Sequence, residues 1–168
     1  MEIEAEKQRK IRTITQKIDK KLGALLMDIP RRVNNLVSIY NTHDPIQIAK
    51  YRGIEIEYYD LGNIKGIYKK ILGNKYIALN EELDQMCMLI AAAHELGHDV
   101  IHGTKQTQLM KDYFLLPNNG IVEIQANKFA AELLIYEGAN YDSYEIKNVA
   151  LYNRMIKTLV QLKNTDIR

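Results

Sequence analysis

Two histidines and a glutamate stand close together near the middle of the chain. The segment His94-Glu95-Leu96-Gly97-His98 has the pattern H-E-x-x-H, in which the two histidines are four positions apart. On an α-helix such residues lie on one face, about 6 Å apart, so both imidazoles can bind one metal ion. Glu95 lies beside them, where a carboxylate can act as a general base in hydrolysis. The spacing predicts a zinc-binding pair with a catalytic glutamate.

A catalytic zinc site generally has three protein ligands and a water molecule, so a third ligand is needed. His102 lies eight positions beyond His94, which is about 12 Å along a helix, so it cannot join the same ion. Cys87, two turns before His94, is excluded for the same reason. Asp99 adjoins His98 but points about 100° away around the helix. The third ligand must therefore come from another segment.

Glu123 is the best candidate for this ligand, because it opens the next predicted helix, residues 121–136. Asn127 follows one turn later on the same face, where its side chain can hydrogen-bond a ligand imidazole. Glu132 and Asp112 are the alternatives. A carboxylate in the first turn of a helix is also favoured by the helix dipole alone, so the position of Glu123 does not by itself prove a metal ligand.

The zinc-binding pair needs a helix to carry it. Asn80 is followed by two glutamates and is predicted to cap a helix that runs to about His102, with Gly103 just past its end. Gly97 stands inside this helix, where glycine costs about 1 kcal/mol relative to alanine. We expect that another helix approaches closely at this point, and the alanines of residues 121–136 fit that role.

A small sheet precedes this helix. The segments Ile54–Tyr59, Lys65–Leu72 and Lys75–Leu79 alternate between polar and apolar residues, and Gly73-Asn74 is a two-residue hairpin signal. The pattern predicts a three-stranded antiparallel sheet. Since Lys75–Leu79 leads directly into the metal-binding helix, we expect it to be a sheet edge to which an extended substrate peptide can add.

Helices flank this centre on both sides. Apolar residues recur at spacings of three and four from Ile11 to Ile29, and Asp44-Pro45 reads as the cap and first residue of a short helix. Asp142 and Glu145 form a capping-box pattern before a last helix. The predicted fold class is α+β, with flanking N- and C-terminal helices.

The composition describes an ordinary globular chain of 168 residues with a net charge of +2. Cys87 is the only cysteine, which excludes an intrachain disulfide and fits a reducing compartment. The longest apolar run, Met86–Ala93, is too short to cross a membrane. These features predict a cytoplasmic location and no membrane partner.

The positive charge is concentrated at one end of the chain. Residues 1–32 hold nine Lys and Arg against five Asp and Glu, a net charge of +4. We expect residues 1–43 to form a basic helical segment and residues 44–168 to form the metal-binding domain. Most charged runs are simply solvated faces, and DNA binding through the basic helix is the weaker alternative.

The motifs together resemble the ImmA/IrrE family of metallo-endopeptidases. The resemblance covers about residues 44–135, including Lys65-Gly66-Ile67-Tyr68, Ala93-His94-Glu95-Leu96-Gly97-His98 and Glu123-x-x-Ala126-Asn127-x-Phe129-Ala130-Ala131. It implies a zincin-like fold in which His94, His98 and Glu123 bind Zn²⁺ and Glu95 is catalytic.

The resemblance also implies a substrate. Similar proteins are typically encoded by phages and mobile elements, and they cleave a transcriptional repressor. The expected activity is therefore hydrolysis of a peptide bond in a repressor-like regulator. The alternative is a zinc-containing regulatory module that binds the repressor or DNA without efficient proteolysis.

Overall fold

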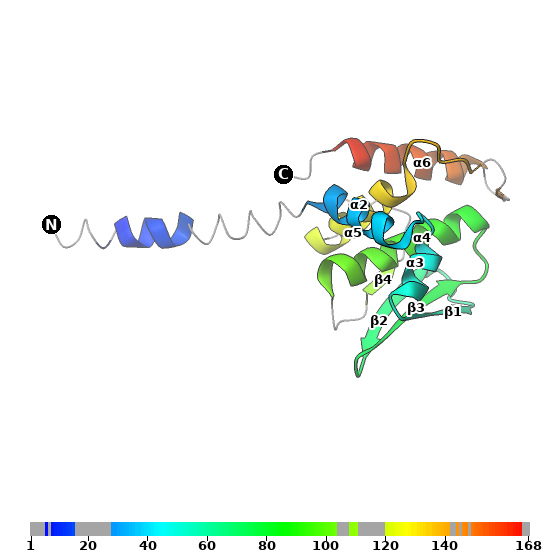
Figure 1. The fold of residues 1–168 in the computed structure, drawn as a ribbon, viewed down its shortest axis with the longest axis horizontal. Helices are drawn as coiled ribbons and strands as arrows, with labels where there is room; N and C mark the ends of the chain where they lie inside the picture. Colours follow the sequence, from blue (N-terminus) through cyan, green and yellow to red (C-terminus); the bar gives the residue numbers. More distant parts are fainter. Residues whose placement is uncertain are drawn as a thin grey trace. The chain divides into compact units, whose positions relative to one another are not determined.

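The computed structural model describes residues 6, 8–15, 28–103, 108–110, 120–141, 144, 146, 147 and 149–165 (Figure 1). The helices are α2 (Ile29–Tyr40), α3 (Pro45–Tyr51), α4 (Gln85–Gly97), the π-helix η1 (His98–His102), α5 (Ile121–Leu134) and α6 (Val149–Asn164). The strands are β1 (Ile54–Tyr59), β2 (Gly66–Ile71), β3 (Asn74–Asn80) and β4 (Gln108–Met110). Residues 29–165 form one compact unit, and residues 1–28 with 166–168 form a second.

The sheet has four strands in the order β1-β3-β2-β4. β2 runs antiparallel to both β3 and β4, whereas β1 runs parallel to β3. The α+β class is as predicted, but the prediction of three purely antiparallel strands is wrong. It assumed that strands adjacent in sequence pair with each other, whereas β1 is separated from β2 by β3.

β3 lies in the middle of the sheet, so the prediction that it is an edge open to a substrate peptide is also wrong. Both of its sides are already hydrogen-bonded, one to β1 and the other to β2. The reason is its apolar character: Ile77 and Leu79 are fully buried, whereas most of β1 is exposed. The strand with the most buried side chains takes the central place, and the more polar strand takes the edge.

The hairpin between β2 and β3 turns one residue earlier than predicted. Ile71 pairs with Asn74, so Leu72 and Gly73 form the turn, with φ values of 49° and 91°. A type I′ turn needs positive φ at both central positions and favours glycine at the second. Gly73 occupies that second position, and Leu72 takes the first with its side chain almost wholly in solvent.

Asp84, not Asn80, caps α4. The Asp84 carboxylate accepts a hydrogen bond of 2.8 Å from the backbone of Cys87. Asn80 instead ends β3, where its amide donates to the carbonyls of Gly62 and Ile64 at 2.9 Å each. Asn80 therefore holds the connection between β1 and β2, and α4 begins only after a further turn of chain.

The other end of this helix is as predicted. α4 continues directly into η1, and Gly103 closes the helical segment in the left-handed conformation with φ 53°. The short helix before the sheet is also confirmed, since Asp44 caps α3 and Pro45 is its first residue.

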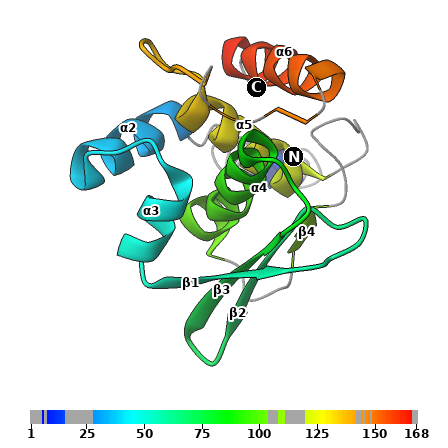
Figure 2. The same ribbon diagram turned by 90° about the vertical axis from the view of Figure 1, so that its right-hand side faces the viewer.

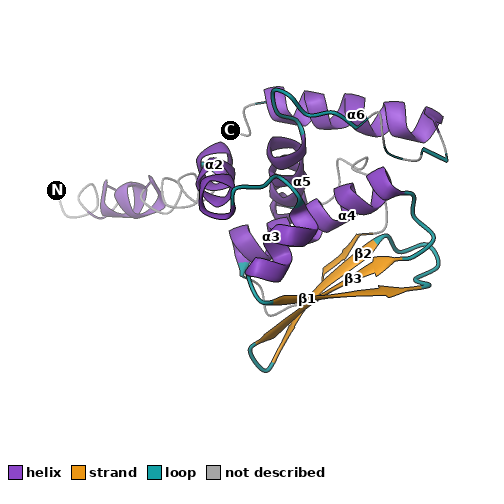
Figure 3. Ribbon diagram, turned by 45° about the vertical axis from the view of Figure 1, so that its right-hand side comes forward, coloured by secondary structure: helices purple, strands orange, loops and turns teal. Residues whose placement is uncertain are grey.

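The helices are stacked on one face of the sheet (Figure 3). α4 contacts β2 and β3, α5 packs across α4, and α2 and α6 both pack against α5 (Figure 2). The predicted close approach at Gly97 is confirmed. A Cβ atom there would lie 3.1 Å from Phe129 Cδ1 and 3.2 Å from Ala126 Cα, so only glycine leaves α5 this near.

The N-terminal unit is described for residues 6 and 8–15, where residues 8–15 are helical and both Ile11 and Ile14 are more than half exposed. The rest of its predicted apolar stripe up to residue 27 lies outside the described residues, as do Asp142 and Glu145 of the capping box. A separate role for residues 1–43 stays a prediction. None of the described helices combines the length and the apolar character that a membrane span requires.

Candidate metal centre

His94 and His98 lie one turn apart at the junction of α4 and η1. The backbone N–H of His98 bonds to the carbonyl of His94, which keeps the helical spacing through the change from α- to π-geometry. The two Nε2 atoms are 3.1 Å apart, and the side chains are 3% and 0% exposed. Both imidazoles therefore point the same way from a buried helix.

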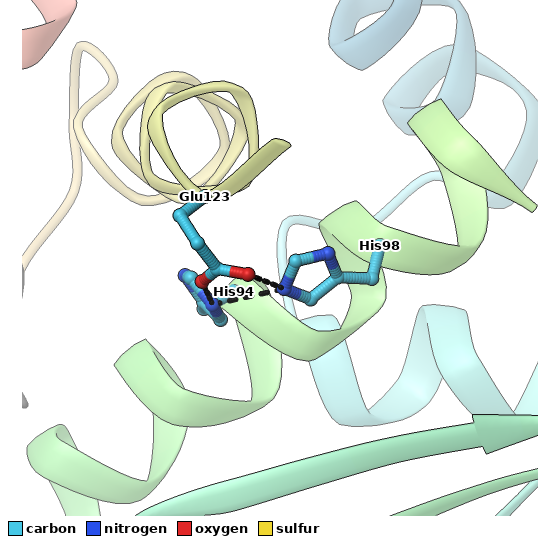
Figure 4. A group of neighbouring side chains, drawn as sticks. All are labelled: His94, His98 and Glu123. Carbon is cyan, nitrogen blue, oxygen red and sulfur yellow. Dashed lines mark hydrogen bonds and ion pairs between the residues drawn. The ribbon is translucent and has the colours of Figure 1, made fainter. Parts of the chain in front are cut away.

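Glu123 meets these imidazoles from the first turn of α5 (Figure 4). Its Oε2 is 3.2 Å from His94 Nε2, and its Oε1 is 3.5 Å from His98 Nε2. Its side chain is 21% exposed, so solvent reaches the cluster on this side. Glu123 lies 25 and 29 positions beyond the two histidines in the sequence, and all three side chains converge on one point.

These distances fit a divalent cation. In a tetrahedral site with bonds of about 2.0–2.1 Å, neighbouring ligand atoms are roughly 3.3 Å apart. Here the two Nε2 atoms lie 3.1 Å apart, and the two oxygens of Glu123 lie 3.2 Å from one and 3.5 Å from the other, so all three side chains can reach one ion. Asn127 Oδ1 lies 2.7 Å from His94 Nδ1. Since this oxygen can only accept, Nδ1 carries a proton, and the neutral form of the ring, which is the form that binds a metal, would present its Nε2 lone pair to the cluster.

The charge of the cluster centres on the carboxylate of Glu123. Burial opposes ionisation of Glu123, but the two imidazoles outweigh it and hold the pKa of the carboxyl well below its usual range. Burial lowers the pKa of His98. Burial opposes protonation of His94 too, but the hydrogen bond with Glu123 raises its pKa. The cluster thus offers one carboxylate and two imidazoles in a largely buried setting.

Glu95 is a residue of α4, and its side chain is fully buried against the sheet. A Cβ atom at Gly66 in β2 would lie 2.9 Å from Glu95 Cγ and 3.0 Å from Oε1. The carboxylate of Glu95 therefore occupies space that exists only because residue 66 lacks a side chain. Glu95 is not among the three residues that converge on the cluster.

The alternative ligands lie elsewhere or outside the described residues. Glu132 pairs with Lys128 at 2.8 Å and with Lys163 at 3.9 Å. Cys87 is buried with its sulfur 3.8 Å from that of Met155. Asp112 lies outside the described residues.

Two contacts at the site were not predicted from the sequence. His102 Nε2 lies 3.2 Å from the carbonyl of Val122, so the end of η1 touches the start of α5 just before Glu123. Asp99 forms a buried network with Arg52, Tyr68 and Lys75. Helix geometry alone predicts that Asp99 points away from the cluster. Its three partners lie far away in the sequence, so no local pattern could have predicted them.

Comparison with known proteins gives a consistent result. Residues 49–145 match the peptidase family described as the IrrE N-terminal-like domain, and this range contains the metal cluster and Glu95. The chain is 33% identical over 141 residues to a protein of Bacillus phage phi105 named "Uncharacterized immunity region protein 2", covering 81% of this chain and 89% of that protein. No solved structure matches the chain. Because the family matches more than half of the chain and the phage relative is 33% identical over 81% of it, the chain belongs to the IrrE N-terminal-like domain family.

Proposed function

We propose that the protein is a zinc-dependent endopeptidase that cleaves a repressor-like transcriptional regulator. One observation carries the proposal: His94, His98 and Glu123 each offer one ligand atom, all within 4.8 Å of one another, and the buried carboxylate of Glu95 lies on the helix that carries the histidines. A closed structural zinc site usually has four protein ligands. Three ligands and a partly exposed side favour a site that leaves one position for water and substrate.

His94, His98 and Glu123 would hold the ion, and Asn127 would keep the His94 ring in the required tautomer through its 2.7 Å hydrogen bond. Zinc bound in this way lowers the pKa of a water molecule to about 7 and polarises the carbonyl of the scissile bond. The ionised state of Glu123 contributes the negative charge that a divalent cation requires.

Glu95 would carry the proton. As a general base its carboxylate accepts a proton from the attacking water, and as a general acid it then donates this proton to the leaving amine. Its tight fit against Gly66 restricts the carboxylate to one place, which suits a transfer that needs defined geometry. No other carboxylate among the described residues lies within the H-E-x-x-H segment.

The substrate class rests on the family and on the relative in phage phi105, which is named as an immunity region protein. The resemblance to the ImmA/IrrE family likewise implies a transcriptional repressor as the substrate. We infer that this chain acts on such a regulator, and that peptide-bond hydrolysis inactivates it.

The direct test is to incubate the protein with the transcriptional regulator encoded beside its gene, with and without a metal chelator, and to analyse the products by mass spectrometry. Two new peptides that appear only without chelator are the expected result. An intact regulator under all conditions would count against proteolysis, and salt-sensitive DNA binding or stable capture of the regulator would then favour the regulatory module.

Replacing Gly66 with alanine is expected to slow cleavage without loss of the metal. The added Cβ would displace the buried side chain of Glu95, to which all three atoms nearest to that Cβ belong. We expect a rate at least about tenfold lower, since misplacing a reacting group by about 1 Å can cost 10²-fold. Cleavage assays and zinc titration of the same sample measure both effects, and wild-type cleavage would contradict the placement of Glu95.

A further inference from the structure

Asp99 immediately follows His98 and is bound by three residues from other elements. Its Oδ2 accepts from Arg52 Nε and Nη2 at 2.9 and 2.7 Å. Its Oδ1 accepts from the Tyr68 hydroxyl at 2.9 Å and pairs with Lys75 Nζ at 2.8 Å. The Asp99 side chain is only 1% exposed, so this carboxylate is held on all sides within the fold.

These partners tie the start of η1 to the layer beneath it. Arg52 is the C-cap residue that follows α3, Tyr68 lies in β2, and Lys75 lies in β3. Figure 3 shows β2 and β3 on the sheet side of α4 and α3 beside that helix. Four short polar contacts from two strands and a helix fix the position and direction of the backbone at Asp99, because charge-assisted bonds are short and directional.

His98 needs such support more than His94 does. His94 is oriented by the hydrogen bond between its Nδ1 and Asn127. In the part of the chain that the structure describes, His98 Nδ1 is buried and has no hydrogen-bond partner. Apart from the contacts of Nε2 with His94 and Glu123 within the cluster, the direction of the His98 ring depends on its packing and its backbone, and that backbone passes directly into Asp99.

We propose that Asp99 is a positioning residue for the metal site, and that its network with Arg52, Tyr68 and Lys75 holds His98 with Nε2 pointing at Glu123. The network takes over for His98 the orienting role that Asn127 performs for His94. The inference rests on the proposed function only in that the ion bound at this cluster is zinc.

Three variants of the 168-residue chain separate positioning from plain stabilisation. Asp99→Asn removes the central charge, and Tyr68→Phe removes one hydrogen bond while keeping the ring and the two cationic partners. Glu132→Gln is the matched control, since Glu132 is also a largely buried carboxylate with two basic partners but does not contact the cluster. For each, zinc affinity is measured by competition with a chromogenic chelator, and the melting temperature of the zinc-free protein is measured alongside.

The Asp99 and Tyr68 variants are expected to bind zinc about 10- to 100-fold more weakly, the usual effect of losing an orienting partner. Glu132→Gln is expected to lower the melting temperature but to keep zinc affinity within about twofold. Unchanged affinity in Tyr68→Phe and in folded Asp99→Asn would overturn the proposal. An equal loss in Glu132→Gln would also overturn it, because the effect would then be general destabilisation.

A second measurement does not need zinc. Long-range ¹H–¹⁵N spectra of the histidine rings in the zinc-free protein report the environment of His98 directly. We expect its ring signals to shift in Tyr68→Phe and to stay in place in Glu132→Gln. If the wild type binds no zinc, the proposed function fails, and these spectra still decide the role of Asp99: unchanged His98 signals would refute it.

Discussion

Replacing Glu95 with glutamine is expected to lower the rate of repressor cleavage by about 10²–10⁴-fold, the usual contribution of a general acid–base residue. Zinc affinity should remain at the wild-type level, because Glu95 is not one of the three residues that converge on the cluster. Glutamine has almost the same size and fits the same space beside Gly66, so the loss reports the missing proton acceptor and not a packing defect.

The comparison variant for this experiment is His98→Ala, which should lose zinc and cleavage together. The two variants then separate proton transfer from metal binding. Cleavage is followed by the appearance of repressor fragments under single-turnover conditions, and bound zinc is measured on the same sample. Full hydrolysis by Glu95→Gln would show that another group moves the proton.

The second large effect is expected for Glu123→Gln. The neutral amide removes the carboxylate charge that faces the two imidazoles at 3.2 and 3.5 Å. Loss of a residue that only orients a ligand typically weakens metal binding by 10- to 100-fold, so loss of the ligand itself should weaken it by more than about 100-fold and abolish cleavage at ordinary zinc concentrations.

The matched control is again Glu132→Gln, on the same helix as Glu123 but paired with Lys128 at the interface with α6. It should keep both zinc and cleavage. Equilibrium dialysis followed by metal analysis measures the affinities. If Glu123→Gln binds zinc as tightly as the control, the carboxylate is not a ligand and the third position belongs to another residue.

Several features that depend on residues close together in the sequence were predicted correctly. Asp44 with Pro45 identified the start of α3, and the left-handed Gly103 the end of η1. The four-residue spacing of His94 and His98 required only that a helix form, and α4 does form there. Glu123 was found because a first-turn carboxylate on the next helix could reach across, and Gly97 indicated where the two helices approach each other.

Non-local pairing could not be predicted in the same way. Nothing in the strand patterns distinguishes a parallel β1–β3 pair from an antiparallel neighbour, since both alternate with the same period. Asn80 and Asp84 are both good capping residues, and only the tertiary contacts of Asn80 with residues 62 and 64 decide between them. The Asp99 network joins positions 52, 68, 75 and 99, so no window of sequence contains it.

The most direct test of the central claim is a crystal structure of the zinc-loaded protein with anomalous diffraction data collected at the zinc absorption edge. We expect one anomalous peak about 2.0–2.2 Å from Nε2 of His94, Nε2 of His98 and a carboxylate oxygen of Glu123. A zinc ion held without Glu123, or a peak elsewhere with this cluster empty, would contradict it.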